Sequence, residues 1–424
     1  MKTFFFLAIA LFLSGCAPRV TVDQSDCLTS INLLDQDGLS VTVTNTDRLQ
    51  EYLNVDFCQS QPYQKVLRVY GRDCQGNIRA IITSYHPNGQ VKQYLEVLNN
   101  RACGAYREWF SNGVKKVDAS VIGGASDINT GAEKTWIFEG VCCAFDEQGA
   151  LIAKINYCKG SLEGDSLYYH PGGTIWKKVP FSQGQMEGIY EMFSPGGTLI
   201  KTEPYCKGKL HGKAYRYWKE GQIASEECYV NGLLKEAVYF LSSGEEVSSI
   251  TEGCGFKAVF GKQGVAEMRE YKDGVPEGEV SIFSKEGTLL TRYALKDGLK
   301  HGEEIEYYQK RTLSDQLYPK LSVQWYQGMI QGVVKTWYDN QVQESQREMC
   351  RNVKTGHAIA WYRDGSLMLE EEYENSKLVM GEYYKRGDAV PLSDVRFGKG
   401  TATLFDGEGN FVKKVEYFNY APVN

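Results

Sequence analysis

A repeat of 24 residues constrains this chain more than any other feature of its sequence. The stretch KGKLHGKAYRYWKEG at 207–221 has a looser copy, KGSLEGDSLYYHPGG, at 159–173. If Gly212 is taken as position zero, backward steps of 24 residues reach Gly188 and Gly164. A period of this length is typical of repeat architectures, in which each unit buries its apolar surface only against its neighbours. The stretch is therefore interpreted as a structural unit rather than as an active-site loop.

The repeat occupies fourteen positions along the chain, some of them with shortened or shifted spacing. The fifth residue after position zero is aromatic in twelve of them: Tyr85, Trp109, Phe145, Tyr169, Phe193, Tyr217, Phe260, Phe283, Tyr307, Trp337, Trp361 and Phe405. A content of 12% aromatic residues would place about two there, so the excess indicates a structural requirement. The ninth residue is glycine in ten of them: Gly89, Gly113, Gly149, Gly173, Gly197, Gly221, Gly264, Gly287, Gly365 and Gly409.

Each unit is predicted to be a β-hairpin. Positions +1 to +6 form one strand, and glycine at +9 supplies the positive φ that a tight turn needs. A second strand covers about +10 to +18, with apolar residues at +11 and +17, such as Ile223 and Tyr229. The even offset places both on one face, where the +5 aromatic side chain is also expected. The rings are predicted to form the core of a single-layer sheet, or alternatively to stack against sugars or a partner's side chains.

This pattern resembles the MORN-repeat variant family of bacteria over roughly residues 70–420. The resemblance is clearest in KGKLHGKAYRYWKEGQIASEECY, DGLKHGEEIEYYQK and DGVPEGEVSIFSKEGTLLTRYAL. It implies a mainly β fold, an extended, twisted, antiparallel single sheet of about fourteen successive hairpins. Many bacterial members are regarded as antitoxins of toxin–antitoxin pairs, and the resemblance extends that expectation to this chain without specifying a partner.

The N-terminus is predicted to be a lipoprotein signal segment, residues 1–15. Lys2 precedes an apolar run at 4–13 that is too short to span a membrane and has the length of a secretory h-region. The run ends at Leu13-Ser14-Gly15-Cys16, which is similar to the lipobox of bacterial lipoproteins, so the resemblance implies lipid on Cys16. Because residue 17 is not Asp, it further implies the outer membrane, facing the periplasm or the cell surface. The alternative is an ordinary signal peptide with a chance cysteine.

Residues 16–70 differ from the repeats of 71–420 and are predicted to be a small α+β module or an N-terminal cap, which a repeat array needs. Three elements are expected there: strands at 39–45 and 64–71, and a helix at 46–53 capped by Thr46 or Asn45. Cys27 and Cys58 flank the module and are candidates for a disulfide.

Three departures interrupt the repeat pattern. Residues 118–131 add twelve residues between two units and are predicted to be a loop. Residues 309–320 lengthen a turn. The unit at Glu236 lacks its glycine and most of its second-strand pattern. Each departure is interpreted first as a tolerated insertion in a turn, and alternatively as a kink or a binding segment.

Charge and cysteine usage exclude several classes of function. Without residues 1–15 the chain keeps 46 basic and 53 acidic residues, a formal net charge of −7, and no basic cluster, so no nucleic acid partner is expected. Eleven cysteines follow Cys16, an odd number, and none of their spacings is a zinc pattern, so no metal is expected. No phosphate-binding loop of the type G-x-x-x-x-G-K-[ST] occurs, and no cofactor is expected.

No catalytic residue is expected. All five histidines fall at repeat positions, which favours structural roles: His86, His170, His211, His301 and His357. Glu304 and Glu306 share a strand face, as do Glu370 and Glu372, and such pairs could serve a glycosidase. A solvated sheet face is the favoured interpretation. The sequence therefore predicts a non-enzymatic, lipid-anchored envelope scaffold that binds a protein partner, with an antitoxin or immunity role implied by the resemblance. The alternative is an envelope-structural protein that binds cell-wall glycan, and a glycan-acting enzyme is the least favoured.

Overall fold

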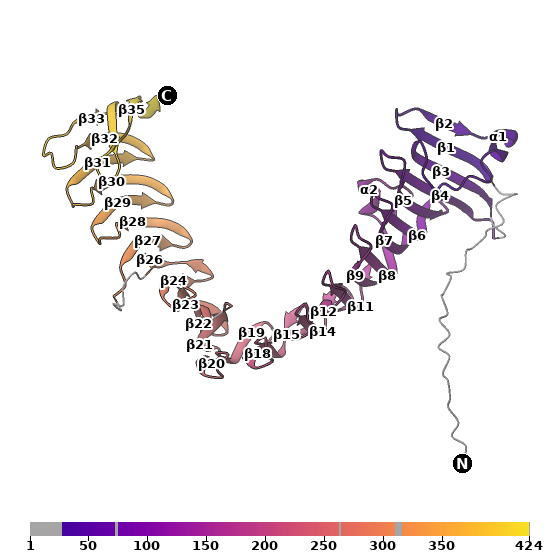
Figure 1. The fold of residues 1–424 in the computed structure, drawn as a ribbon, viewed down its shortest axis with the longest axis horizontal. Coiled ribbons are helices and arrows are strands. Elements are labelled where there is room, and N and C mark those ends of the chain that lie inside the picture. The colour runs from indigo at the N-terminus through magenta and orange to yellow at the C-terminus, as the bar shows by residue number, and fades with distance from the viewer. Residues whose placement is uncertain (1–27, 73–74, 263, 310–315, 424) are drawn as a thin grey trace, which may run out of the picture. The chain divides into compact units, whose positions relative to one another are not determined.

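The computed structural model describes residues 28–72, 75–262, 264–309 and 316–423 (Figure 1). The predicted signal segment 1–15, the lipidation residue Cys16 and the cysteine Cys27 all lie outside the described residues. Cys58 forms no disulfide within the described part of the chain, and its pairing with Cys27 stays a prediction.

Within the described residues, one antiparallel sheet of 36 strands forms, in which neighbours in sequence pair with each other. Up to residue 186 they are β1 (Leu28–Asp35), β2 (Ser40–Val43), β3 (Tyr63–Arg72), β4 (Ile78–Tyr85), β5 (Val91–Leu98), β6 (Arg101–Trp109), β7 (Lys115–Gly123), β8 (Ile137–Phe145), β9 (Leu151–Cys158), β10 (Ser161–Leu162), β11 (Gly164–Tyr169), β12 (Ile175–Ser182) and β13 (Gln185–Met186). The predicted fold class, a mainly β sheet of successive hairpins, is confirmed.

The remaining strands continue the same order to the last described residues. They are β14 (Gly188–Phe193), β15 (Leu199–Cys206), β16 (Lys209–Leu210), β17 (Gly212–Tyr217), β18 (Ile223–Val230), β19 (Leu233–Phe240), β20 (Glu246–Thr251), β21 (Cys254–Phe260), β22 (Val265–Lys272), β23 (Val275–Phe283), β24 (Leu289–Lys296), β25 (Leu299–Lys300), β26 (Gly302–Tyr307), β27 (Pro319–Tyr326), β28 (Met329–Trp337), β29 (Gln343–Cys350), β30 (Val353–Trp361), β31 (Leu367–Glu374), β32 (Lys377–Tyr383), β33 (Ser393–Arg396), β34 (Lys399–Phe405), β35 (Phe411–Phe418) and β36 (Ala421–Val423).

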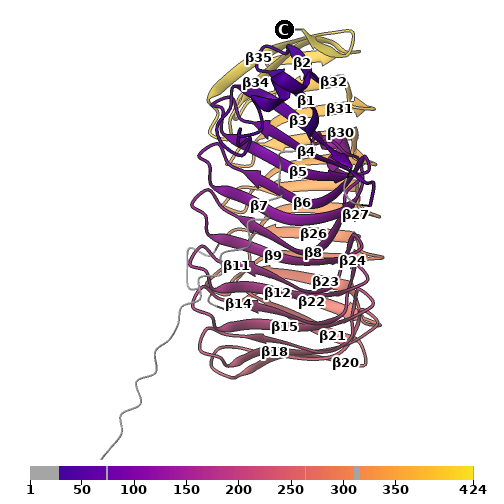
Figure 2. The ribbon, with the colours of Figure 1, turned by 90° about the vertical axis from the view of Figure 1, so that its right-hand side faces the viewer.

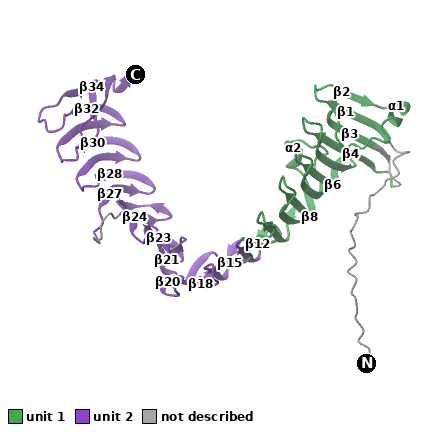
Figure 3. Ribbon diagram, viewed as in Figure 1, with its two compact units in different colours: residues 1–185, 195–197 green, residues 186–194, 198–424 purple. Residues whose placement is uncertain are grey.

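The sheet divides into two compact units, shown in Figure 3. Unit 1 comprises residues 1–185 and 195–197, and unit 2 comprises 186–194 and 198–424. Within unit 1 the strands stack side by side along the unit, as Figure 2 shows. Among the described residues, no helix is both long and apolar enough to cross a membrane.

Two kinds of turn alternate along the sheet. Nine of the ten predicted turn glycines have positive φ, and the tenth, Gly264, adjoins residue 263, which lies outside the described residues. In the hairpin of Gly89, the His86 N–H donates to Gln90 O over 2.8 Å, which closes a three-residue loop with glycine in the left-handed position. The second kind has two residues, both with positive φ, such as Lys207 and Gly208. This is the type I′ geometry, which matches the right-handed twist of the flanking strands.

The pairing within each hairpin follows the repeat, but a bulge turns the +5 and +11 residues to the face opposite +17, so the prediction that all three share one face was wrong. In the hairpin of β17 and β18, Tyr217 at +5 lies opposite Ile223 at +11, and Gly212 at zero lies opposite Tyr229 at +17. A bulge follows the +4 residue, between Arg216 and Tyr217. We call face A the face that carries the +2, +15 and +17 residues, and face B the opposite face, which carries +1, +3, +14 and +16.

The core lies mainly at mid-strand rather than at the aromatic row. The +2 residue is fully buried in many hairpins, including Ala214, Val280, Val334, Ala358 and Ala402. Of the twelve predicted aromatic residues, only Tyr85 and Phe260 are buried, and the other ten keep part of their surface exposed. The +5 residue ends its strand beside a turn, where fewer neighbouring strands cover it than at mid-strand. The rings are therefore only a partial core.

The N-terminal module is continuous with the repeats. β1 pairs with both β2 and β3, and β3 pairs with β4. The helix α1 (Thr46–Gln50) is capped by Asn45, whose Oδ1 accepts from the N–H groups of Asp47 and Arg48 at 2.9 and 3.2 Å. Leu49 and Phe57 pack against Ile31 and Val66 of the sheet in one buried cluster.

The predicted loop at 118–131 is largely ordered, and this prediction was wrong. Strand β7 runs on to Gly123, and a second short helix, α2 (Thr130–Glu133), follows the bend. Ile128 and Trp136 are buried, and the Trp136 ring lies 4.6 Å from that of Tyr106. These two apolar side chains hold the segment against face A, while α1 lies on the other side of the sheet (Figure 1).

The unit at Glu236 forms a regular hairpin despite its weak pattern. Strands β19 and β20 pair from Ala237 opposite Ile250 to Phe240 opposite Glu246. Gly244, one residue earlier than expected, takes the positive φ of the turn. The turn lengthened at 309–320 falls partly on 310–315, which lie outside the described residues, and β27 begins at Pro319.

Candidate functional site

The side chain just before position zero bonds the backbone of the next two-residue turn. Each accepts from the N–H of the turn residue 20 positions later: Glu163 from Gln183, Glu187 from Lys207, His211 from Asn231 and Gln331 from Arg351, at 2.6 to 3.3 Å. All four donors have positive φ. His211 therefore makes in its hairpin the bond that a glutamate makes in its neighbours. The sequence pattern showed the position but not this bond.

The side chain at +6 also bonds the next hairpin, but it is the donor, and the acceptor is a backbone carbonyl oxygen. His86 Nε2 lies 2.9 Å from Trp109 O, so this nitrogen carries the proton. Trp218 Nε1 donates to Phe240 O at 3.1 Å, and Tyr338 Oη donates to Trp361 O at 2.9 Å. Polar side chains at regular positions are thus used to join hairpins.

In the first acidic pair considered for catalysis, one carboxylate is occupied by a cationic and an aromatic donor. Glu304 is 7% exposed and receives Lys300 Nζ at 2.7 Å and Trp325 Nε1 at 2.7 Å. In the other group the engaged carboxylate is Glu371, between the predicted pair of Glu370 and Glu372. Within the described residues no group of three or more His, Cys, Asp or Glu side chains could hold a metal ion.

A recurring carboxylate cluster was missed at the level of sequence. Glu227 accepts from Tyr229 Oη and Tyr239 Oη at 2.8 Å each and pairs with Lys257 Nζ at 2.7 Å. A second copy lies 144 residues later: Glu371 accepts from Tyr373 and Tyr383 Oη at 2.9 Å each and pairs with Lys354 at 3.4 Å. The sequence pattern that could have identified this cluster is a glutamate followed by tyrosines two and twelve residues later.

Opposing effects act on the pKa of Glu227. Burial raises the pKa, but the Lys257 ammonium and the two tyrosine hydroxyls outweigh burial and hold it below its usual value. Burial, with the nearby Glu227 charge and hydrogen bond, in turn raises the pKa of Tyr229 and Tyr239. The charged Glu227 carboxylate thus joins strands β18, β19 and β21 through its hydrogen bonds and its ion pair.

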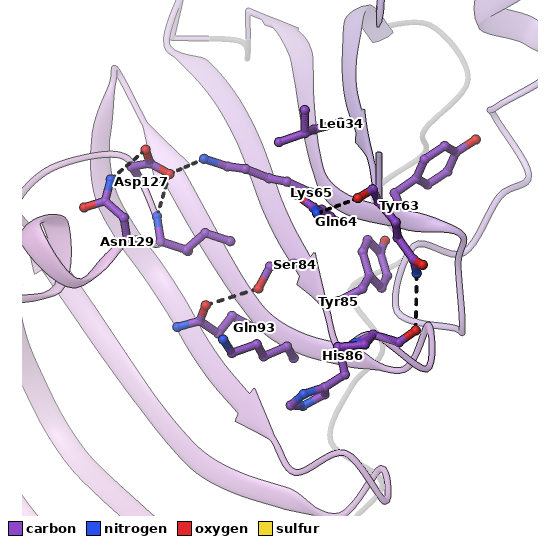
Figure 4. Close-up of a pocket in the computed structure, with 14 residues that line it drawn as sticks. Leu34, Tyr63, Gln64, Lys65, Ser84, Tyr85, His86, Gln93, Asp127 and Asn129 are labelled. Atoms are coloured by element: carbon purple, nitrogen blue, oxygen red, sulfur yellow. Dashed lines mark hydrogen bonds and ion pairs between the residues drawn. The ribbon is translucent and has the colours of Figure 1, made fainter. Parts of the chain in front are cut away.

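A concave N-terminal pocket of about 530 Å³ lies on face A of unit 1 (Figure 4). Its floor includes Lys65, Ser84 and Gln93, which are cross-strand neighbours, and its wall is formed by the segment with Asp127 and Asn129. Lys65 extends across the pocket to form an ion pair with Asp127, and Ser84 Oγ donates to Gln93 Oε1 at 3.1 Å. Burial raises the pKa of Asp127, but the bonds from Lys65 and the Ile128 N–H outweigh burial and lower it.

A second concavity of about 370 Å³, which we call the Arg216 groove, lies in unit 2. It is lined by Met192, Ile200, Lys201, Glu203, Ala214, Tyr215, Arg216, Ser225, Glu227, Lys257, Ala258, Val259 and Phe260. It combines the Glu227 cluster with three cationic side chains and with the apolar side chains of Met192 and Ile200. Its lining comes from five strands, β14, β15, β17, β18 and β21, so no single stretch of sequence indicated it.

Residues 210–231 match the family model described as MORN repeat variant. This segment is thus similar to a MORN repeat, and the sheet of successive hairpins defines the chain as a repeat scaffold. No curated protein matches the chain.

Two solved structures are similar in part. A porin-like protein from Bacteroides uniformis has 9% identity, covers 73% of this chain and 94% of its own, and gives a TM-score of 0.13. The TcdB2–TccC3–TEV structure has 11% identity, covers 91% of this chain and 24% of its own, and also gives 0.13. With scores this low, neither likeness carries an argument about function.

Proposed function

We propose that this repeat scaffold binds a protein partner at the cell envelope, where lipid on Cys16 anchors it. The observation that supports the proposal is the half-exposed aromatic row. Ten of the twelve +5 rings remain partly exposed, and three of the +11 residues opposite them are openly exposed: Ile175, Ile223 and Phe411, at 37%, 41% and 59%. Aromatic residues are enriched at protein interfaces, because a rigid ring buries a large area with little loss of entropy.

The lattice of bonds between hairpins supports a binding role over a catalytic one. His86, His211 and Glu304 are held by neighbouring hairpins, so these groups maintain the scaffold. A role as antitoxin or immunity protein would follow if the partner were a toxin, and it is supported by the family resemblance alone.

Photo-crosslinking in intact cells tests the proposal. A photoreactive amino acid replaces Ile223 in the aromatic row or, as the matched control, Lys213, which is exposed on the same face at the other end of the hairpin. We expect a discrete crosslinked protein from position 223 and none from position 213. Absence of any specific product from positions 175, 223 and 411 would contradict partner binding through this row.

A glycan is the second candidate ligand, and the N-terminal pocket favours it. Gln36, Gln64, Gln93 and Asn129 line this pocket together with the ring of Tyr63. Amide groups offer both a donor and acceptors, as the hydroxyl groups of a sugar require. Co-sedimentation of the purified protein with insoluble cell wall tests this alternative, and loss of sedimentation on Gln93→Ala would localise the binding to the pocket.

A further inference from the structure

The Arg216 groove is formed where unit 2 brings non-neighbouring strands face to face. Strands β19 and β20 separate β18 from β21 along the sheet, yet Lys257 of β21 reaches Glu227 of β18 at 2.7 Å. Arg216 of β17 likewise donates to Phe260 O of β21 at 3.4 Å. Since Ala237 is a small buried residue of the intervening β19, the sheet can coil tightly here and leave a concave face A.

The charges of the groove do not balance. Glu227 is engaged by Lys257 and two tyrosines, and Glu203 is engaged by Lys201 Nζ at 2.9 Å. Arg216 is exposed, and within the described residues its guanidinium donates only to the carbonyl oxygen of Phe260, over a long 3.4 Å. The groove therefore presents one guanidinium with no carboxylate, on a chain of formal net charge −6.

The groove also offers an apolar wall beside this cation. Met192 and Ile200 line it, and both are partly exposed. A planar guanidinium binds a carboxylate through two parallel hydrogen bonds. A volume of about 370 Å³ lies at the small end of ligand pockets and suits one or two side chains rather than a folded domain.

We propose that the Arg216 groove binds a segment of a protein partner in which an acidic residue stands beside an apolar one. The carboxylate pairs with Arg216, and the apolar side chain packs against Met192 and Ile200. The inference rests on the proposed partner-binding function and identifies both the groove and the chemistry of the segment it takes.

A binding measurement with synthetic peptides tests the chemistry. The probe is a fluorescently labelled pentapeptide with one aspartate between two leucines, and its control carries asparagine in place of the aspartate. Arg216→Gln is compared with Lys213→Gln, which removes the same charge from face B of the same hairpin. Arg216→Lys keeps the positive charge but removes the planar guanidinium, so it separates the effect of charge from that of the two parallel hydrogen bonds.

We expect the aspartate peptide to bind the full chain and the asparagine peptide to bind on the order of tenfold more weakly. Arg216→Gln should weaken binding by a similar factor and Arg216→Lys by less, while Lys213→Gln leaves it within about twofold. Added salt should weaken the binding of the aspartate peptide but not that of the asparagine peptide. Equal binding of both peptides, no effect of Arg216→Gln, or no binding by the unchanged chain at about 1 mM overturns the inference.

Crosslinking in cells separates this inference from the proposed function. A photoreactive residue at Met192 in the groove is compared with one at Ile223 in the aromatic row. Products at both positions, with the Met192 product lost on Arg216→Gln, support the inference. If position 223 gives a product and position 192 gives none, the inference that the groove binds the partner is overturned, while the proposed partner binding stands. No product at either position overturns both.

Discussion

At the scale of residues, one position of the repeat can be filled by different side chains as long as they present an acceptor. The residue before zero is Glu163, Glu187, His211 or Gln331, and each accepts from a turn N–H. Since the turn residue has positive φ, its N–H cannot join the ladder of the strand and needs this partner. His211 serves here as a hydrogen-bond acceptor, whereas Nδ1 of His301, at the same position of its unit, has no partner among the described residues.

Replacement of His211 should therefore matter less than replacement of Tyr217. His211→Ala removes one exposed hydrogen bond, about 0.5–1 kcal/mol of the free energy of unfolding, and His211→Glu should restore it. Tyr217→Ala removes a half-buried ring, at a cost of about 1–3 kcal/mol. Thermal melts measure the order. Loss of partner binding in His211→Ala with an unchanged melt would contradict the structural role.

Glu227 should make stability depend on pH. Because its folded pKa lies below the usual 4.5, its contribution is present above about pH 4.5 and is lost as pH falls through the lower folded pKa. Glu227→Gln should lower the free energy of unfolding by about 3–5 kcal/mol at neutral pH, and by less at about pH 3. The control, Glu226→Gln, breaks an exposed pair with Lys213 and should cost under about 1 kcal/mol. Urea unfolding at both pH values measures the difference, and a pH-independent effect would refute it.

At the scale of elements, the segment after β7 shows how two apolar residues can order an insertion. Residues 124–129 are irregular, yet Asn129 caps α2 through its Oδ1 and Trp136 Nε1 donates to Ala125 O at 2.9 Å. Lys65 and Asp127 add an ion pair at the outer side. The insertion therefore acts as a second layer on face A of unit 1.

Trp136→Ala should release this layer. The ring is 7% exposed and packs against Tyr106, so its loss should cost about 3–5 kcal/mol. The effect should be confined to unit 1, because a repeat array is held together by contacts between neighbours. Hydrogen exchange should show lost protection in β5 to β7 and unchanged protection in β28 to β31. Trp337→Ala, at a half-exposed +5 position, is the control and should show the reverse distribution.

At the scale of the whole molecule, the repeat permits a long surface to be built from small units. Each hairpin contributes an aromatic position and an apolar position opposite it, as in Trp361 and Leu367, so the same type of contact is offered many times. Interfaces gain their free energy from a few buried anchors surrounded by weaker contacts. The row of such positions on face B meets that description, and the Arg216 groove on face A offers a separate site.

Anchoring belongs to the whole chain as well. Cys16→Ser should leave the mature protein without lipid and release it from membranes into the soluble fraction, because lipid chains supply the membrane affinity of an anchored protein. Fractionation and intact mass of the purified protein measure both effects. A wild-type protein that is processed but carries no lipid mass on Cys16 would contradict the prediction.

The sequence by itself determined the hairpins, because turn chemistry and strand alternation are encoded within each 24-residue unit. Gly221 at a turn and the pairing of Tyr217 with Ile223 follow from positions close together in the chain. The tertiary structure alone decided which side chains are buried and which meet across hairpins. Lys257 reaches Glu227 only because the sheet coils between β18 and β21, and Trp136 is buried only because face A is open to receive it. Such contacts join residues 30 or more positions apart, and they depend on the twist accumulated over several strands, which no single unit specifies.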